Sequence, residues 1–240
     1  QNYANIGSFA VDLSYSSSNG ITNGASGATS FATGLNTEAR GTSSASFGRN
    51  TEAAGDYAVS MGNFSKATGT SSLASGWFSD ATGFNTTAIG YHTEASGTYA
   101  IALGTGTKAE SVSSIAVGQY NVGGGNPTNW NGFDSVFEVG NGSDEFNTSN
   151  ALTVSKNGIV TAPSFQMNLI IDDKALITKE YADSNYDESS GLEALNEGNG
   201  IGWRLKSNNT ALYGDLGAQA IDLSESTSVS SSNGATGLNA

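Results

Sequence analysis

Cysteine is absent from the 240 residues, so no disulfide bond can stabilise this chain. Charged residues make up only 13% of the sequence, about half the usual share. Large aliphatic residues are sparse, and no run of about eighteen apolar residues predicts a membrane-spanning helix. A chain of this composition has little to bury on its own, which argues against an ordinary globular domain.

Basic residues are also scarce. Lys and Arg number 9 against 22 Asp and Glu, which gives a formal net charge of −13. Nucleic-acid-binding proteins carry basic stripes, and anionic lipid surfaces attract basic segments. The charge therefore argues against nucleic acid and against direct membrane docking as partners.

Glycine, in contrast, is abundant and follows a strict period. Residues 21–118 form seven consecutive units of fourteen residues, each closed by a glycine. A second glycine occupies the seventh position of six units, with Ser111 in the last one, and alanine always stands two positions earlier. The closing glycines are Gly34, Gly48, Gly62, Gly76, Gly90, Gly104 and Gly118. A disordered Gly/Ser linker has no reason to keep this register, so the period predicts a repeating structure.

Each unit contains two short extended pieces separated by its glycines. In the second piece apolar residues alternate with small ones, as in Tyr57-Ala58-Val59-Ser60-Met61. Alternation of this kind places the apolar residues on one face of a strand and the small residues on the other. We therefore predict a β-solenoid with two strands per turn, in which seven turns would span roughly 34 Å.

The apolar positions of these strands form a single stripe, which would be exposed to solvent in an isolated chain. A long apolar stripe usually marks an interface, and closed symmetry is the usual way to bury it. We therefore expect three chains to meet through this stripe. The candidate residues for such a trimer core are Val59, Met61, Ile89, Ile101, Leu103, Ile115 and Val117.

The repeat, with its pattern Ala-x-Gly-x-x-[Ser/Tyr]-[Ala/Val/Ile]-[Ala/Ser]-x-Gly, resembles the head repeat of trimeric autotransporter adhesins. The resemblance covers residues 21–118 and recurs in all seven units. It implies a left-handed parallel β-roll of three intertwined subunits. Ser111 departs from the pattern, and we expect it to mark the last turn.

A second, longer period encloses the first. Residues 1–20 are echoed at 211–230 with an offset of 210, so that Tyr3 matches Tyr213 and Asp12 matches Asp222. We interpret 1–20 as a lead-in segment of the β-roll and 217–240 as the start of the next unit. The chain is then expected to be a segment of a longer tandem array.

The middle of the chain leaves the fourteen-residue pattern. For residues 119–165 we predict a β connector, because FDSVFEVGNG alternates and ALTVSKNGIV forms a hairpin pattern around Asn157-Gly158. Residues 166–190 carry the one helical signal and predict a short helical neck. Residues 191–216 are expected to form a second β connector, with GIGWRL as a strand. The runs FEVGNG and SNALTVSKNGIV are similar to segments of phage tail fibres and surface fibres, and ITKEYAD to their neck coiled coils.

No stretch of the sequence predicts catalytic, cofactor-binding or metal-binding chemistry. The adjacent carboxylates, such as Asp172–Asp173, lie in polar stretches where a solvated surface is the default. GNGIG lacks the strand–helix context and full spacing of a dinucleotide loop. His92, the only histidine, is expected to be an exposed turn residue. We predict that the protein is not an enzyme.

Aromatic residues near the repeat corners have two interpretations: packing between chains of a trimer, or contact with a glycan or another surface. The candidates for surface contact are Trp77, Phe78, Tyr91 and Trp130.

Three hypotheses follow. The first is a structural and adhesive repeat unit of a long homotrimeric extracellular fibre, located at a cell surface, with a glycan or protein receptor as partner. The second is a tail fibre of a phage or phage-like injection particle. The third is a monomeric β-solenoid that binds glycan or ice, for which an outward threonine ladder would be needed.

Overall fold

The computed structural model describes residues 6–16 and 23–166, together with the backbone of three further strands at 192–197, 200–205 and 221–222. The chain divides into two compact units, Gln1–Phe165 and Gln166–Ala240. The predicted neck at 166–190 lies outside the described residues apart from Gln166, as does most of the 217–240 segment.

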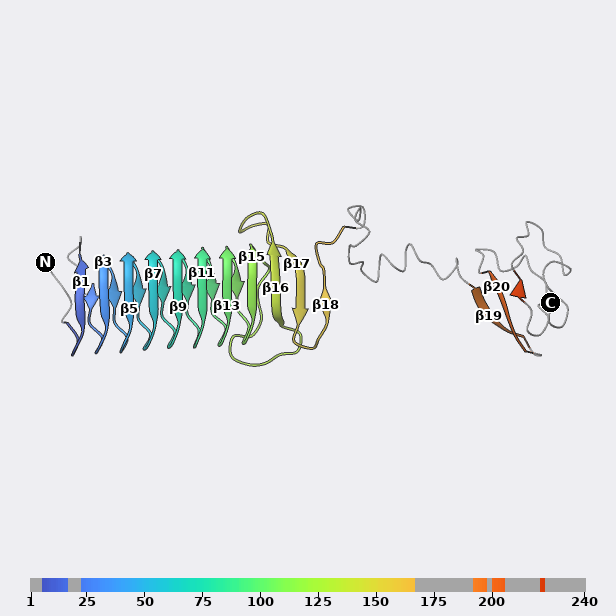
Figure 1. Ribbon diagram of the computed structural model, residues 1–240, viewed down its shortest axis with the longest axis horizontal. Coiled ribbons are helices and arrows are strands. Elements are labelled where there is room, and N and C mark those ends of the chain that lie inside the picture. Colours follow the sequence, from blue (N-terminus) through green and yellow to red (C-terminus); the bar gives the residue numbers. More distant parts are fainter. Residues whose placement is uncertain (1–5, 17–22, 167–191, 198–199, 206–220, 223–240) are drawn as a thin grey trace. The chain divides into compact units, whose positions relative to one another are not determined.

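The first unit is a parallel β-solenoid in which each fourteen-residue turn contributes one long and one short strand (Figure 1). The long strands stack in sequence order, and each residue pairs with its equivalent one unit later, as Ala88 does with Ala102. The long strands are β1 (Val11–Tyr15), β3 (Phe31–Leu35), β5 (Ala45–Arg49), β7 (Val59–Asn63), β9 (Leu73–Trp77), β11 (Thr87–Tyr91), β13 (Ile101–Thr105) and β15 (Ile115–Gln119).

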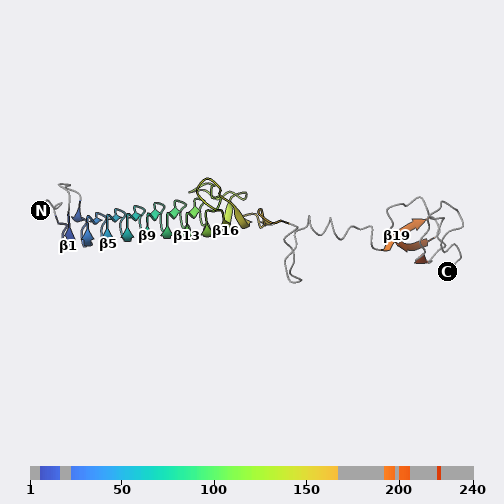
Figure 2. The same cartoon turned by 90° about the horizontal axis from the view of Figure 1, so that it is seen from above.

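The short strands form a second, seven-stranded parallel sheet behind the first, and Figure 2 shows the two layers from above. Glu94, for example, pairs with Lys108 in the next turn. The short strands are β2 (Gly24–Ala25), β4 (Glu38–Ala39), β6 (Glu52–Ala53), β8 (Lys66–Ala67), β10 (Asp80–Ala81), β12 (Glu94–Ala95) and β14 (Lys108–Ala109).

The two glycines of each unit are required for different reasons. The closing glycines have φ between 95° and 142°, a backbone region that side chains disfavour. The mid-unit glycines have ordinary φ but stack closely: a Cβ on Gly69 would lie 1.8 Å from the carbonyl oxygen of Gly83. Without these glycines, consecutive turns could not come close enough for their strands to hydrogen-bond.

The interior between the two sheets contains only small side chains. Alanines from both sheets, among them Ala39, Ala81, Ala88 and Ala102, have no exposed surface. Serine and threonine fill the remaining inward positions, and several of them cap the nearby corner: the Ser72 hydroxyl donates to the Gly69 carbonyl at 2.6 Å. The solenoid is therefore too narrow to enclose any large aliphatic side chain.

Two columns of non-glycine residues adopt the left-handed conformation at the corners. Asn, Asp and His tolerate this region better than most residues, but Phe and Tyr also occupy it here. One column follows the closing glycines by two residues and comprises Asn36, Asn50, Phe64, Phe78, His92 and Tyr120, with Gly106 at the sixth rung. The other follows the mid-unit glycines by two residues and comprises Thr29, Ser43, Tyr57, Ser71, Asn85, Tyr99 and Ser113.

The stacking changes after β15. Strand β16 (Ser135–Asn141) continues the long sheet in parallel, whereas β17 (Asn150–Ser155) and β18 (Val160–Thr161) pair antiparallel. The short-strand sheet ends at β14, where the Asn121 side chain accepts from Lys108 N at 2.7 Å and donates to Lys108 O at 2.9 Å. The Asn121 amide thus takes the place of an eighth short strand. The buried carboxylate of Glu138 in turn accepts from the Asn121 side chain and from Gly123 N.

The second unit contains a three-stranded sheet, β19 (Leu192–Glu197), β20 (Gly200–Leu205) and β21 (Ile221–Asp222). Strands β19 and β20 are antiparallel, and β21 pairs in parallel with β20. The GIGWRL strand expected from the sequence is β20.

The solenoid predicted from the period is confirmed, with its two strands per turn and its small residues inside. At the lead-in, β1 pairs with β3 at an offset of twenty residues instead of fourteen. Ser111 lies in the last turn that carries a short strand, as expected. No further turn stacks over it, and its hydroxyl donates to the Ser135 carbonyl at 2.7 Å. No helix is present in the residues that the structure describes.

Candidate functional site

The outward face of the long-strand sheet carries the stripe predicted from the sequence. Val59, Ile101 and Val117 are half-buried, and the four larger members are more exposed. Met61 and Leu103 are each 37% exposed, Ile115 is 38% and Ile89 is 39%. The inward neighbours of these residues, such as Ala102, are completely buried. The solenoid thus presents its large aliphatic side chains outward, in register along consecutive rungs.

Aromatic rings continue this surface around the corner at the middle of the rod. Phe64 and Phe78 stack in parallel with ring centroids 4.9 Å apart, and Phe78 lies 4.9 Å from the ring of His92. Trp77 and Tyr91 form an edge-to-face pair at 5.4 Å in the neighbouring column. Three of the four predicted contact residues, Trp77, Phe78 and Tyr91, therefore belong to one cluster.

The fourth predicted contact residue, Trp130, lies away from that cluster in the connector loop. Its ring is 62% exposed, and the ammonium of Lys156 sits 5.0 Å from the ring centroid. The Lys156 Nζ is also 4.0 Å from an Asp134 carboxylate oxygen, and burial lowers the pKa of Lys156 while Asp134 opposes that shift.

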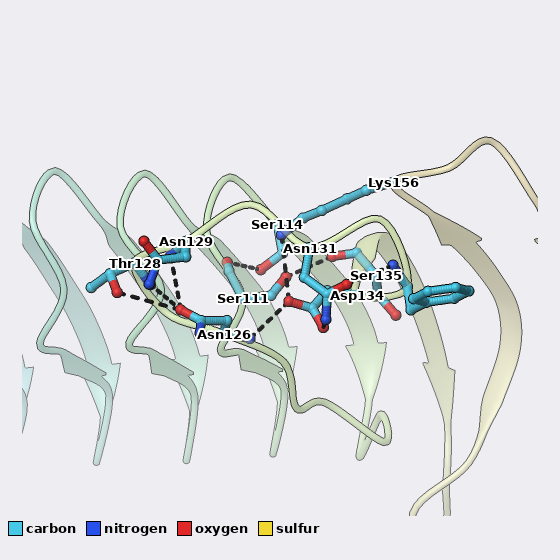
Figure 3. A network of polar contacts seen from close by, with 10 residues as sticks. Ser111, Ser114, Asn126, Thr128, Asn129, Asn131, Asp134, Ser135 and Lys156 are labelled. Atoms are coloured by element: carbon cyan, nitrogen blue, oxygen red, sulfur yellow. Dashed lines mark hydrogen bonds and ion pairs between the residues drawn. The ribbon is translucent and has the colours of Figure 1, made fainter.

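The connector loop is held on the last solenoid turns by a network of polar contacts (Figure 3). Asp134 accepts from the Asn126 backbone at 2.8 Å, and the Asn126 side chain accepts from the backbones of Thr128 and Asn129. Backbone bonds from Thr98 to Pro127 and from Val112 to Asn126 attach the loop to the solenoid. The loop thereby covers the corner at Ser111, in the last turn that has a short strand.

A hollow of about 350 Å³ lies beside the last rungs, between the ring column and the short-strand sheet. The rings of Phe78, Tyr91, His92 and Tyr120 form one side. The other side carries Asp80, Glu94 and Lys108 from the short strands, and Glu145 and Thr148 from the connector.

Asp80 and Glu94, the two carboxylates that the short strands bring to the hollow, are half-buried. Burial raises the pKa of Asp80 above its usual 3.8, although Lys66 and His92 partly oppose this. Burial also raises the pKa of Glu94 above 4.5, and the nearby Glu110 adds to the shift. In both residues burial disfavours the ionised carboxylate, and the nearby cations offset this only in part.

A smaller hollow of about 250 Å³ lies earlier along the same side of the rod. Asn36 and Asn50 occupy the corner column there, and the Asn36 amide donates to Asn50 at 3.0 Å. The short strands contribute Glu38 and Glu52, both of which pair with Arg40. This hollow repeats the geometry of the larger one without its rings.

Within the described residues no group of three or more His, Cys, Asp or Glu side chains is placed to hold a metal ion. The same part of the chain has no helix of the length and apolarity that crossing a membrane requires. Thr37, Thr51 and Thr93, which recur at the third position of their units, are buried inside the solenoid. They therefore present no outward ladder to ice or glycan.

Sequence reasoning missed three features. The hollow could not be found because Asp80 and His92 are twelve residues apart and meet only when the turn closes. The Asn121–Glu138 pair lies outside the repeat, where no period identifies inward positions. The rings of Phe84 and Tyr99, 5.6 Å apart at the opposite corner, occupy different positions of their units.

The solenoid matches a known family. A family model described as YadA head domain repeat, in two copies, matches residues 39–65, 53–79, 81–107 and 95–121. No curated protein matches the chain. The tail-fibre alternative receives no support from these comparisons. Head repeats of this kind, on a parallel solenoid, point to an adhesin-type fibre repeat unit that is structural and not enzymatic.

Proposed function

We propose that this chain, whose solenoid consists of YadA-type head repeats, is a building block of a homotrimeric extracellular fibre. Three solenoids would meet through the outward stripe of the long-strand sheet. The fibre would display its remaining surfaces at a cell surface and bind a glycan or a protein receptor. Weak contacts repeated along such a fibre gain avidity without any new contact.

One observation carries this proposal: the large aliphatic side chains point out of the solenoid. Ile101 and Leu103 on β13 stand in register with Ile115 and Val117 on β15, and Val59 and Met61 lie three rungs earlier on β7. The interior of these turns holds only alanine, serine and threonine. Burying apolar surface stabilises a protein by about 25 cal/mol per Å². A single solenoid leaves part of that stabilisation unused, and threefold closure would recover it.

The trimer can be tested by measuring the solution mass of residues 1–240 with light scattering. A trimer would have three times the 24.4 kDa of one chain. A mass near 24.4 kDa with intact β-structure, at concentrations well above micromolar, would overturn the proposal.

The hairpin connector, the neck and the second connector have proposed roles within the same fibre. They would join one solenoid segment to the next, and the 210-residue echo sets the spacing of that alternation. Trp77, Phe78, Tyr91 and Trp130 are proposed as the residues that contact a receptor or a neighbouring chain.

A further inference from the structure

The hollow beside the last rungs arises where the ring column is interrupted. Phe64, Phe78 and His92 follow each other on successive rungs, and Gly106 then provides no side chain. The next rung places Tyr120 against this gap, since a Cβ on Gly106 would lie 2.2 Å from Tyr120 Cδ1. The result is a space of about 350 Å³ whose lining includes Phe78, Tyr91, His92 and Tyr120.

Negative charge dominates the polar side of this space. Asp80 and Glu94 stand opposite each other on adjacent short strands, and Glu145 reaches the same hollow from the connector. Lys108, paired in register with Glu94, is the cation that lines it, beside the imidazole of His92. None of the three carboxylates is hydrogen-bonded or ion-paired in the described part of the chain.

We propose that this hollow binds a cationic side chain, the guanidinium of arginine or the ammonium of lysine, from a basic segment of a partner protein. Aromatic faces attract such cations, and the attraction grows when the cation is partly desolvated. Unpaired carboxylates accept the charge-assisted hydrogen bonds that a guanidinium donates from its planar fork of N–H groups.

The charge balance favours a cation over a neutral sugar as the ligand. A sugar could stack on the rings, but it would leave the repulsion of Glu94 by Glu110 and Asp80 in place. An arriving positive charge would relieve that repulsion. The formal net charge of −13 would in addition attract basic segments from a distance.

This inference deepens the proposed adhesive function and rests on it for its biological meaning. All of the residues that line the hollow belong to one chain, so binding itself does not require the trimer. The solution mass and the binding measurement can therefore fail independently.

His92 allows a direct experiment because it is the only histidine of the chain and lines the hollow. Its ring carbon–proton signals can be followed by NMR during titration with a short peptide of alternating glycine and arginine. The matched control peptide carries citrulline, which keeps the shape of arginine and removes its charge. Maltohexaose serves as a neutral saccharide probe.

We expect the arginine peptide to shift the His92 signals in a saturable way, and the citrulline peptide and maltohexaose to leave them in place. Changing Asp80→Asn together with Glu94→Gln should weaken binding about tenfold. The control pair Glu38→Gln with Glu52→Gln makes the same charge change in the same strand column, beside asparagines instead of rings. It should weaken binding less than about twofold, because charges beyond a Debye length are screened.

Three outcomes would overturn the inference: no shift with the arginine peptide, an equal shift with citrulline, or an equal loss in the control pair. A shift with maltohexaose alone would assign the hollow to saccharide instead. If the Asp80/Glu94 variant does not fold, the comparison of arginine with citrulline on the natural chain still decides.

Discussion

At the scale of single residues, the fold depends on positions where the side chain is absent or small. Stacked turns bring the carbonyl oxygen of one mid-unit glycine to the place where the Cβ of the previous one would stand, as between Gly69 and Gly83. Between β3 and β15 the inward positions of the strands and corners hold alanine, serine or threonine. Ser111 is tolerated at a glycine position because the short-strand sheet ends there.

The contrast between Gly69 and Ser111 gives a prediction about stability. Gly69→Ser should lower the free energy of unfolding by at least about 2 kcal/mol, because the backbone of the next turn must move. The reverse change, Ser111→Gly, loses only one hydrogen bond to Ser135 and should cost about 1 kcal/mol. Urea unfolding followed by circular dichroism measures both, and equal losses would show that turn stacking does not select glycine.

The carboxylates of the hollow predict a dependence of stability on pH. Because the pKa of Asp80 and of Glu94 is raised in the folded state, the native chain holds protons there that the unfolded chain has lost. The ordinary pKa values are 3.8 for Asp80 and 4.5 for Glu94. The free energy of unfolding therefore falls as the pH rises from these values through the raised pKa of each residue in the folded state.

The variant Asp80→Asn with Glu94→Gln should remove this part of the pH dependence. Thermal unfolding between about pH 4 and about pH 7 measures it, and the variant should show the greater gain in melting temperature at the higher pH. A gain in melting temperature that is the same at every pH would mean that folding does not raise the pKa of these two carboxylates.

At the scale of elements, the ends of the solenoid present a problem that its middle does not have. A two-residue strand such as β14 leaves backbone donors and acceptors open once no further short strand follows, and open sheet edges invite pairing with other chains. The side-chain amide of Asn121 offers a donor and an acceptor to Lys108, as a strand would. Strand β16 and the connector loop complete the closure.

Removing that amide should therefore loosen the last turn. Asn121→Ala would leave both backbone groups of Lys108 without their partner and remove one of the two donors to the buried Glu138, at a cost of about 2 kcal/mol or more. We expect faster amide hydrogen exchange at Lys108 and an earlier urea midpoint. Asn129→Ala, an exposed residue of the connector, is the matched control and should change stability within about 0.5 kcal/mol. Unchanged exchange at Lys108 would contradict the capping role.

At the scale of the whole molecule, the outward stripe is the feature that supports the proposed assembly of several chains. The same narrow interior that fixes the fold excludes valine, isoleucine, leucine and methionine from it. These residues must either remain exposed or meet another chain, and contiguous exposed apolar surface usually marks an interface. The assembly that we propose through the stripe would be a consequence of the small core.

The trimer proposed above predicts which substitutions should dissociate it. Ile89→Glu with Leu103→Glu places charges on the stripe and should reduce the mass measured by light scattering towards that of one chain, with lower stability. The control variant, Thr82→Glu with Ser96→Glu, adds the same charge directly after the short strands β10 and β12, away from the stripe. It should leave the mass unchanged. Equal masses for the two variants would place the interface elsewhere.

The sequence by itself determined the repeating part of the fold. The closing glycines from Gly34 to Gly118 placed the corners, and alternation in stretches such as Val59-Ser60-Met61 separated outward from inward residues. These inferences succeeded because equivalent positions of a strict repeat have equivalent neighbours. The pattern of one unit therefore applies to all seven.

Tertiary structure alone decided the rest. The hollow depends on Gly106 standing between His92 and Tyr120 along the rod, and on Asp80 and Glu94 lying across the corner from them. The cap depends on Asn121 reaching Lys108 after the repeat has ended. Neither arrangement has a periodic signature, because each is made by residues that differ from their equivalents in the other turns. Their contacts exist only once the turns are stacked.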